Sequence, residues 1–144
     1  MKVYLDNCCF NRPFDDQTQV RIRLEAEAKL DIQSRIEDGR LSLVWSYMLD
    51  FENLSNPFDE RRETIQKWRD CCTQDMEETT ALLNEAQDLE GRGVRPKDAL
   101  HVACAVSAEC EYFVTTDDLL LAKLSDYDRI AVVSPPELIR RLDA

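Results

Sequence analysis

Glycine, proline, histidine and long apolar runs are all scarce in this sequence. Three glycines and five prolines among 144 residues leave no stretch typical of a long linker, so we expect a single domain over residues 1–144. No apolar run is long enough to cross a membrane, and the start lacks the pattern of a signal peptide, because Lys2 leads into a short apolar run that ends at Asp6. We therefore predict a cytoplasmic protein with reduced thiols and no membrane contact.

The cysteines lack the spacing of a zinc site. Four of the six form the adjacent pairs Cys8–Cys9 and Cys71–Cys72, no CxxC motif occurs, and His101 is the single histidine. Cys104 and Cys110 stand among apolar residues, which predicts that they are small core residues. Zinc is therefore not the metal expected here.

Acidic residues greatly outnumber basic ones. The chain has 29 Asp and Glu against 18 Lys and Arg, a formal net charge of -11 at pH 7. Such a surface repels phosphate backbones at long range, which counts against a nucleic-acid protein on averages. A bound divalent metal and a few arginines can reverse the sign of the field inside one cleft, so net charge does not decide what a cleft binds.

Short apolar runs alternate with helical patterns along the chain. Strands are predicted over residues 2–5, 41–45, 112–115 and 130–133, and a loop is predicted around Asn11-Arg12-Pro13. Helices are predicted over residues 19–38, 46–54, 59–71, 76–90 and 97–108, with a short one after Pro135-Pro136. This alternation predicts an α/β fold, a three-layer α/β/α sandwich with a central parallel β-sheet.

The helix predicted over residues 19–38 carries apolar residues at every fourth position. We expect this stripe to face the core and the helix to end at Gly39. Its members are Val20, Leu24, Ala28, Ile32 and Ile36.

Four segments each offer a carboxylate to one edge of the predicted sheet. Asp6 ends the first strand, Asp117 follows the third, and Asp98 lies in the first turn of the apolar helix that leads into that third strand. Glu52, or alternatively Asp50, lies within two turns after the second strand. Because ligand clefts of parallel sheets open at the carboxyl ends of the strands, these acids are candidates for one site.

Each acid also has an ordinary structural explanation. Asp6 and Asp117 could cap the helices that follow them, the helix dipole favours Asp98 in a first turn, and Glu52 could be solvated. Their joint placement is harder to explain in this way. Two carboxylates about 5 Å apart repel by roughly 3 kcal/mol at an effective dielectric near 20, so clustering them requires a cation. Oxygen ligands favour Mg²⁺ or Mn²⁺, and such a centre suits phosphodiester hydrolysis.

Four short segments resemble the acidic motifs of the PIN-domain family. They are Leu5-Asp6-Asn7, Asp50-Phe51-Glu52-Asn53, Asp98-Ala99-Leu100-His101 and Thr115-Thr116-Asp117-Asp118. Their order and spacing and the total length agree with that family, so the resemblance covers essentially the whole chain. The DALH segment and the later TTD are its more specific parts.

The resemblance implies roles for these residues and partners for the chain. Asp6, Glu52, Asp98 and Asp117 become the metal-binding and catalytic acids of a Mg²⁺- or Mn²⁺-dependent ribonuclease that cleaves single-stranded RNA. Asp118 is a possible substitute ligand. Many small PIN proteins are the toxin of a toxin–antitoxin pair, which implies a cognate antitoxin and a homodimer. The helices over residues 59–71 and 76–90 support the dimer weakly, through apolar residues that we expect one small core to leave partly uncovered, namely Ile65, Trp68, Leu82 and Leu83.

Other residues were weighed for roles in the same site. His101 is predicted to be a satisfied core histidine rather than a general base, and Trp45 a core residue rather than a stacking surface, with Trp68 open to either. Candidate phosphate contacts are Arg12, Arg61, Arg62 and Arg95.

Three competing functions were compared with the ribonuclease. A phosphoacceptor receiver domain needs a paired acid after the first strand, where Asp6 is followed by Asn7. An aspartyl phosphohydrolase needs a second Asp at the position of Cys8. A PIN-like domain that has lost catalysis and serves as a protein-binding module remains the alternative.

Overall fold

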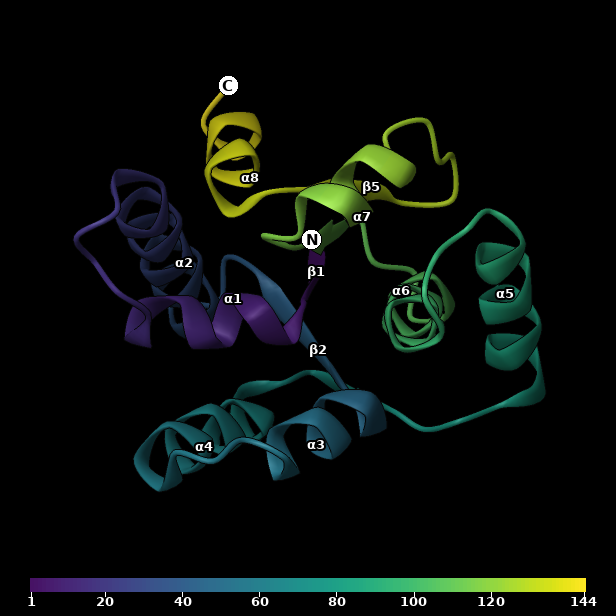
Figure 1. Cartoon of the computed structure of the whole chain (residues 1–144), viewed down its shortest axis with the longest axis horizontal. Helices are drawn as coiled ribbons and strands as arrows, with labels where there is room; N and C mark the ends of the chain where they lie inside the picture. Colours follow the sequence, from purple (N-terminus) through teal and green to yellow (C-terminus); the bar gives the residue numbers. More distant parts are fainter.

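Five strands form one parallel sheet at the centre of the computed structural model, which describes residues 1–144 (Figure 1). The strand order across the sheet is β3-β2-β1-β4-β5, so β1 lies in the middle with β2 and β4 as its neighbours. The strands are β1 (Lys2–Leu5), β2 (Ser42–Ser46), β3 (Gln74–Met76), β4 (Tyr112–Val114) and β5 (Ala131–Val133).

Helices cover both faces of this sheet. In Figure 1, α1 and α2 lie on one side and α5 and α6 on the other, and α5 packs closely along α6. The α-helices are α1 (Asn7–Asn11), α2 (Val20–Glu37), α3 (Tyr47–Leu54), α4 (Asp59–Gln66), α5 (Thr80–Gly91), α6 (Pro96–Ser107), α7 (Asp118–Lys123) and α8 (Pro135–Leu142). Two 3₁₀-helices, η1 (Arg12–Phe14) and η2 (Lys67–Cys71), complete the fold. None of the helices combines the length and the apolar character that crossing a membrane requires.

The predicted three-layer α/β/α sandwich with a parallel sheet is confirmed. All four predicted strands are present within one residue of their expected limits, and so is the buried helix that Pro96 opens. The fifth strand, β3, was missed, and the predicted helix over residues 76–90 therefore begins later, at Thr80. The segment after Asp6 is helical rather than a loop, because α1 and η1 follow one another there.

The predicted stripe of α2 is wrong in its first half. Val20 and Leu24 are exposed, whereas Ile32 and Ile36 are buried as expected. A spacing of four residues advances about 40° further than a full turn of an α-helix, so a stripe drawn at every fourth position winds around the helix. In the first half of α2 the buried residues are Glu25 and Ala26 instead.

The core is built on the middle strands and on α6. Val3, Tyr4 and Leu5 of β1 are almost completely buried, and α6 buries Val102 and Cys104 against the sheet. Cys104 and Cys110 are therefore core residues, as predicted.

The strand order has a topological switch point between β1 and β4. From β1 the chain builds β2 and β3 on one side and then crosses to build β4 and β5 on the other. In parallel sheets such a switch point, at the carboxyl ends of the strands, is where a cleft opens. Asp6 directly follows β1, and Asp117 lies three residues after β4, so both stand at this switch point.

Candidate functional site

Asp6 is the buried member of the predicted acids. Its backbone N–H donates to the Val114 carbonyl at 2.9 Å, so β1 and β4 are still hydrogen-bonded where Asp6 begins the loop. Its carboxylate accepts hydrogen bonds from the Asn7 backbone N–H at 2.8 Å and from the Thr115 hydroxyl, also at 2.8 Å. Asp6 is therefore the N-cap of α1, as the structural explanation predicted, and it is also fixed to the end of β4.

Asp117 likewise caps a helix with one oxygen and leaves the other for the site. Its Oδ1 accepts from the backbone N–H groups of Leu119 at 3.0 Å and Leu120 at 3.3 Å, at the start of α7. Its Oδ2 lies 4.0 Å from Nη2 of Arg95. Asp117 can therefore cap α7 with one oxygen and contact a ligand with the other.

Asp98 lies where the charges of two other predicted acids act on it. It lies half-buried in the first turn of α6. Burial raises the pKa of its carboxyl group, and the negative charges of Asp6 and Asp117 raise that pKa further, while Arg95 and His101 act in the opposite direction. The carboxylates of β1, α6 and the β4 loop therefore share one electrostatic environment.

Glu52 faces the same space from α3. It lines a pocket of about 520 Å³ with Asp98, Arg95, Lys97 and Pro96. Burial raises the pKa of Glu52, but the hydrogen bond with His101 and the charges of His101 and Lys97 outweigh burial, so the pKa is lowered overall. Glu52 is therefore a carboxylate at neutral pH.

Asp50, the alternative to Glu52, serves the structure instead. Its Oδ1 accepts from Nε1 of Trp45 at 2.9 Å and from Nε2 of Gln66 at 2.8 Å. A buried indole N–H needs an acceptor, and Asp50 supplies it. Of the two acids on α3, Glu52 is the one beside Asp98.

His101 is buried directly behind Glu52, with both ring nitrogens in hydrogen bonds. Nε2 and Glu52 Oε1 are 2.6 Å apart, and Nδ1 and the Tyr4 hydroxyl are also 2.6 Å apart. The Tyr4 hydroxyl in turn lies 2.6 Å from the Ser46 hydroxyl, which accepts from the Leu49 backbone N–H. The prediction of a satisfied core histidine is confirmed, and the imidazole also holds Glu52 in place.

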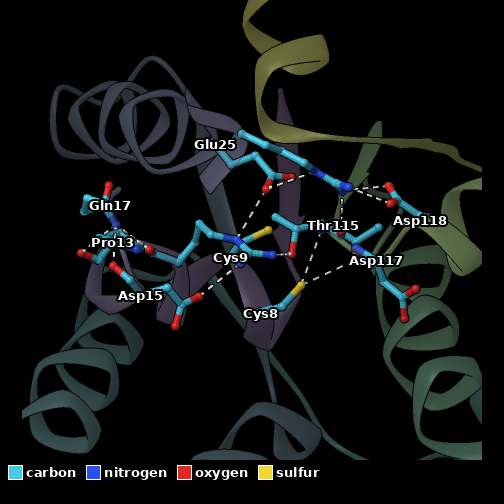
Figure 2. A network of polar contacts seen from close by, with 12 residues as sticks. Cys8, Cys9, Pro13, Asp15, Gln17, Glu25, Thr115, Asp117 and Asp118 are labelled. Atoms are coloured by element: carbon cyan, nitrogen blue, oxygen red, sulfur yellow. Dashed lines mark hydrogen bonds and ion pairs between the residues drawn. The ribbon is translucent and has the colours of Figure 1, made fainter. Parts of the chain in front are cut away.

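A second polar network fixes the loop that carries Asp117 (Figure 2). Glu25 of α2 is buried, and its Oε1 lies 3.5 Å from Nε of Arg12 and 3.5 Å from Nε of Arg21. Arg12 also donates to the Thr116 hydroxyl at 2.8 Å, and Arg21 makes a two-pronged pair with exposed Asp118 at 2.6 and 2.7 Å. Glu25 Oε1 and Arg12 Nε are buried without a hydrogen-bond partner, so their attraction is that of charges alone, whereas the pair of Arg21 with Asp118 is exposed and worth about 0–1 kcal/mol.

Asp118, the possible substitute ligand for Asp117, is paired with Arg21 in this structure. Its carboxylate is exposed and held by Arg21, and the pKa of Asp118 is lowered chiefly by that hydrogen bond.

Cys8 and Asn7 are site residues to which the sequence assigned no definite role. The Cys8 sulfur lies 3.5 Å from Asp6 Oδ2 and 3.5 Å from the Thr115 hydroxyl, and it accepts from the Thr116 backbone N–H at 3.4 Å. Asn7 Oδ1 is buried and has no hydrogen-bond partner. Adjacency to Asp6 was the one sequence signal that could have indicated either residue.

The side chains around the pocket match a metal centre in chemical type but not in spacing. No group of three or more His, Cys, Asp or Glu side chains lies close enough together to hold one as the side chains are placed. The chemistry of the donors nevertheless suits a hard divalent cation, because Glu52 and Asp98 offer carboxylate oxygens to the same pocket and the amide oxygen of Asn7 is buried without a donor. The residues present therefore fit Mg²⁺ or Mn²⁺ in type.

The four arginines predicted to contact phosphate differ in their exposure and in the partners that they already have. Arg12 is held in the network around Glu25, and Arg62 pairs with Asp59 at 2.8 Å. Arg61 lies over the rings of Phe14 and Phe58 and donates to the Phe14 carbonyl. Arg95 is the most exposed of the four, at 64% of its side chain, and it borders the pocket, with one 4.0 Å contact to Asp117.

Comparison with known proteins adds a fold-level finding. No protein-family model matches the sequence, and no curated protein does. Two solved structures are similar over nearly their whole length. One is VapBC2 from Rickettsia felis bound to a DNA fragment from their promoter, with a TM-score of 0.57, 9% identity and coverage of 93% of this chain and 98% of that chain. The other is VapBC-1 from nontypeable Haemophilus influenzae, with a TM-score of 0.58, 13% identity and coverage of 94% and 98%.

These two structures are toxin–antitoxin complexes whose VapC component is a PIN domain. At such low identity the likeness establishes the fold and leaves the chemistry to the residues of this chain.

Proposed function

We propose that this chain, which has the PIN-domain fold, is a Mg²⁺- or Mn²⁺-dependent endoribonuclease and the toxin of a toxin–antitoxin pair. One observation carries the proposal. Asp6, Asp98 and Asp117 come from three separate segments, yet Asp6 is hydrogen-bonded to Thr115 after β4, Asp117 lies 4.0 Å from Arg95, and Arg95 lines one pocket with Asp98. Glu52 stands beside Asp98 in the same pocket.

The residues divide into two groups by what they would do. Asp6, Glu52, Asp98 and Asp117 would hold the metal, and Arg95, at the rim, would contact the phosphate. When bound, the divalent ion supplies activation of water and neutralises charge for phosphodiester hydrolysis. Of the other possible nucleophiles and bases, His101 is buried and Cys9 has a pKa raised chiefly by burial, which supports water as the nucleophile.

The partners of the chain belong to the same proposal. Both similar structures are VapBC complexes, which supports a cognate antitoxin. We also propose a homodimer, although fewer apolar residues are exposed for its interface than the sequence predicted. Ile65, Trp68 and Leu82 are buried in the chain's own core, so that only Leu83 of the four remains exposed. Sedimentation that shows only monomer at high concentration would contradict the dimer.

The nuclease is tested by cleavage of a single-stranded RNA in Mg²⁺ or Mn²⁺. EDTA should abolish cleavage, and Asp98→Asn should reduce it by about a hundred-fold or more, which is the scale of losing one group that stabilises the transition state. Asp118→Asn is the matched control, because it makes the same change in an exposed acid held by Arg21, and it should keep the activity.

Cleavage that survives both EDTA and Asp98→Asn would contradict this mechanism. A folded wild-type protein that cleaves no RNA in either metal, yet binds its antitoxin, would instead favour the protein-binding module.

A further inference from the structure

Phe51 exposes its phenyl ring next to the acid pocket. It directly precedes Glu52 on α3, and 54% of its surface is accessible. The Lys97 ammonium lies 5.7 Å from the centre of this ring. Lys97 also lines the pocket with Glu52 and Asp98, so one side chain links the ring to the acids.

The other aromatic side chains are less suited to contact a ligand at this pocket. Trp45 and Trp68, the tryptophans considered as stacking surfaces, are both buried. The remaining exposed aromatic rings, Phe14 and Phe58, both lie against the Arg61 guanidinium, with their ring centres at 5.2 and 4.5 Å. Phe51 is therefore the exposed ring with a link to the acids.

Two exposed cations, Arg95 and Lys97, line the pocket of an acidic protein. Arg95 and Lys97 flank Pro96 at the start of α6, and both are exposed. The nearest carboxylate to Arg95 is that of Asp117, at the limit of an ion pair, 4.0 Å. In a chain of net charge -11, two cations without a close ion pair beside a pocket of acids are placed to attract a polyanion.

We propose that Phe51, Lys97 and Arg95 form a nucleobase subsite for single-stranded nucleic acid. A base stacks on the Phe51 ring, and Lys97 and Arg95 hold the adjoining phosphates, so that the backbone enters the pocket lined by Glu52 and Asp98. Bases in a duplex are already stacked on their neighbours, so a ring of this kind selects unpaired strands and tolerates any base. The subsite rests on the proposed function, because it places RNA at those acids.

The test is binding of a short fluorescent single-stranded RNA of mixed sequence, followed by anisotropy at low salt in EDTA, where no cleavage occurs. Phe51→Ala should weaken binding by about five-fold or more, the lower end of what loss of one stacked base causes. Phe51→Tyr should restore it, since a phenol ring also stacks. The matched control is Phe58→Ala, which removes an equally exposed ring away from the pocket and should leave binding unchanged.

A second probe separates stacking from a merely structural role. Against an abasic sugar-phosphate oligomer of the same length, wild type and Phe51→Ala should bind equally, whereas Lys97→Gln should weaken binding to both probes. Equal RNA binding by wild type and Phe51→Ala would overturn the subsite while leaving metal-dependent cleavage intact.

Other outcomes have equally definite meanings. If Phe51→Ala leaves RNA binding unchanged but alters sedimentation or antitoxin binding, Phe51 is a protein contact and the proposal is wrong. If the wild type neither binds nor cleaves RNA, the proposed function fails together with the subsite.

Discussion

His101 holds Glu52 through an imidazole whose second nitrogen is itself fixed. The hydrogen bonds run from Glu52 through His101 and Tyr4 to Ser46, across α3, α6, β1 and β2. Burial lowers the pKa of His101, but the hydrogen bond with Glu52 and the charges of Asp6 and Glu52 raise it by more. A buried polar chain of this kind is stabilising only when every member has a partner.

Tyr4→Phe tests that chain by removing one hydroxyl. The change leaves His101 Nδ1 and the Ser46 hydroxyl without their present partner, so we expect about 1–3 kcal/mol of lost stability, measured by urea unfolding. Tyr47→Phe is the control, because the Tyr47 hydroxyl makes only an exposed hydrogen bond with Glu78, and it should cost less than about 0.5 kcal/mol. Equal losses in the two variants would contradict the argument.

Individual residues could be predicted from the sequence only as far as local pattern reaches. The apolar neighbours of His101 indicated its burial, but its partners Tyr4 and Glu52 come from distant segments. The choice between Asp50 and Glu52 could not be made from helix spacing, because it depends on which acid the buried Trp45 indole meets. Such pairings are properties of tertiary packing.

At the scale of elements, α2 shows how a polar residue is accommodated on a buried face. Lys29 is almost completely buried, and its Nζ donates to Gln33 at 2.6 Å and lies over the rings of Phe10 and Trp68, at 5.3 and 5.1 Å. Burial lowers the pKa of Lys29 from 10.5 to about 8. The folded protein therefore releases this proton at a lower pH than the unfolded chain does.

The sign of the pH dependence follows from that difference. Between about pH 8 and pH 10.5 the unfolded chain binds the Lys29 proton and the folded protein does not, so stability rises with pH across this window. The shift alone corresponds to about 3 kcal/mol, and the contacts with Phe10 and Trp68, which favour the charged form, reduce the expected gain to about 1–3 kcal/mol.

Lys29→Met isolates this contribution. We expect the stability difference between wild type and variant, measured by urea unfolding from about pH 7 to pH 10, to change in favour of wild type as pH rises. A difference that stays constant across the window would contradict the lowered pKa.

The elements that the sequence did not predict are short or lie at an edge. β3 (Gln74–Met76) carries no apolar run and pairs with β2 alone, so neither alternation nor hydrophobicity indicated it. α1 has five residues and begins at the Asp6 cap, which reads equally well as a loop. The central strands and the apolar α6 were predictable because burial on both faces leaves a continuous apolar signal.

At the scale of the whole molecule, topology brings the acids together. Alternating strands and helices predicted the parallel sheet, but the order β3-β2-β1-β4-β5 comes from long-range pairing. That order makes β1 and β4 neighbours, which places Asp6 beside Thr115 and brings Asp117 to the same edge. The net charge of -11 describes the whole chain. It does not describe the rim of the pocket, where Arg95 and Lys97 are both exposed.

The central claim, that these acids hold a divalent cation, is tested most directly by melting temperature during a titration with Mg²⁺ or Mn²⁺. Metal that binds the folded state alone relieves the repulsion among Asp6, Asp98 and Asp117. At ten times its Kd it should stabilise wild type by roughly 1.4 kcal/mol, or about 3–6 °C for a domain of this size. Asp98→Asn should melt higher than wild type without metal and lose the response, while Asp118→Asn should keep it. A wild-type melting temperature that stays constant up to millimolar metal, or an equal rise in Asp98→Asn, would contradict the claim.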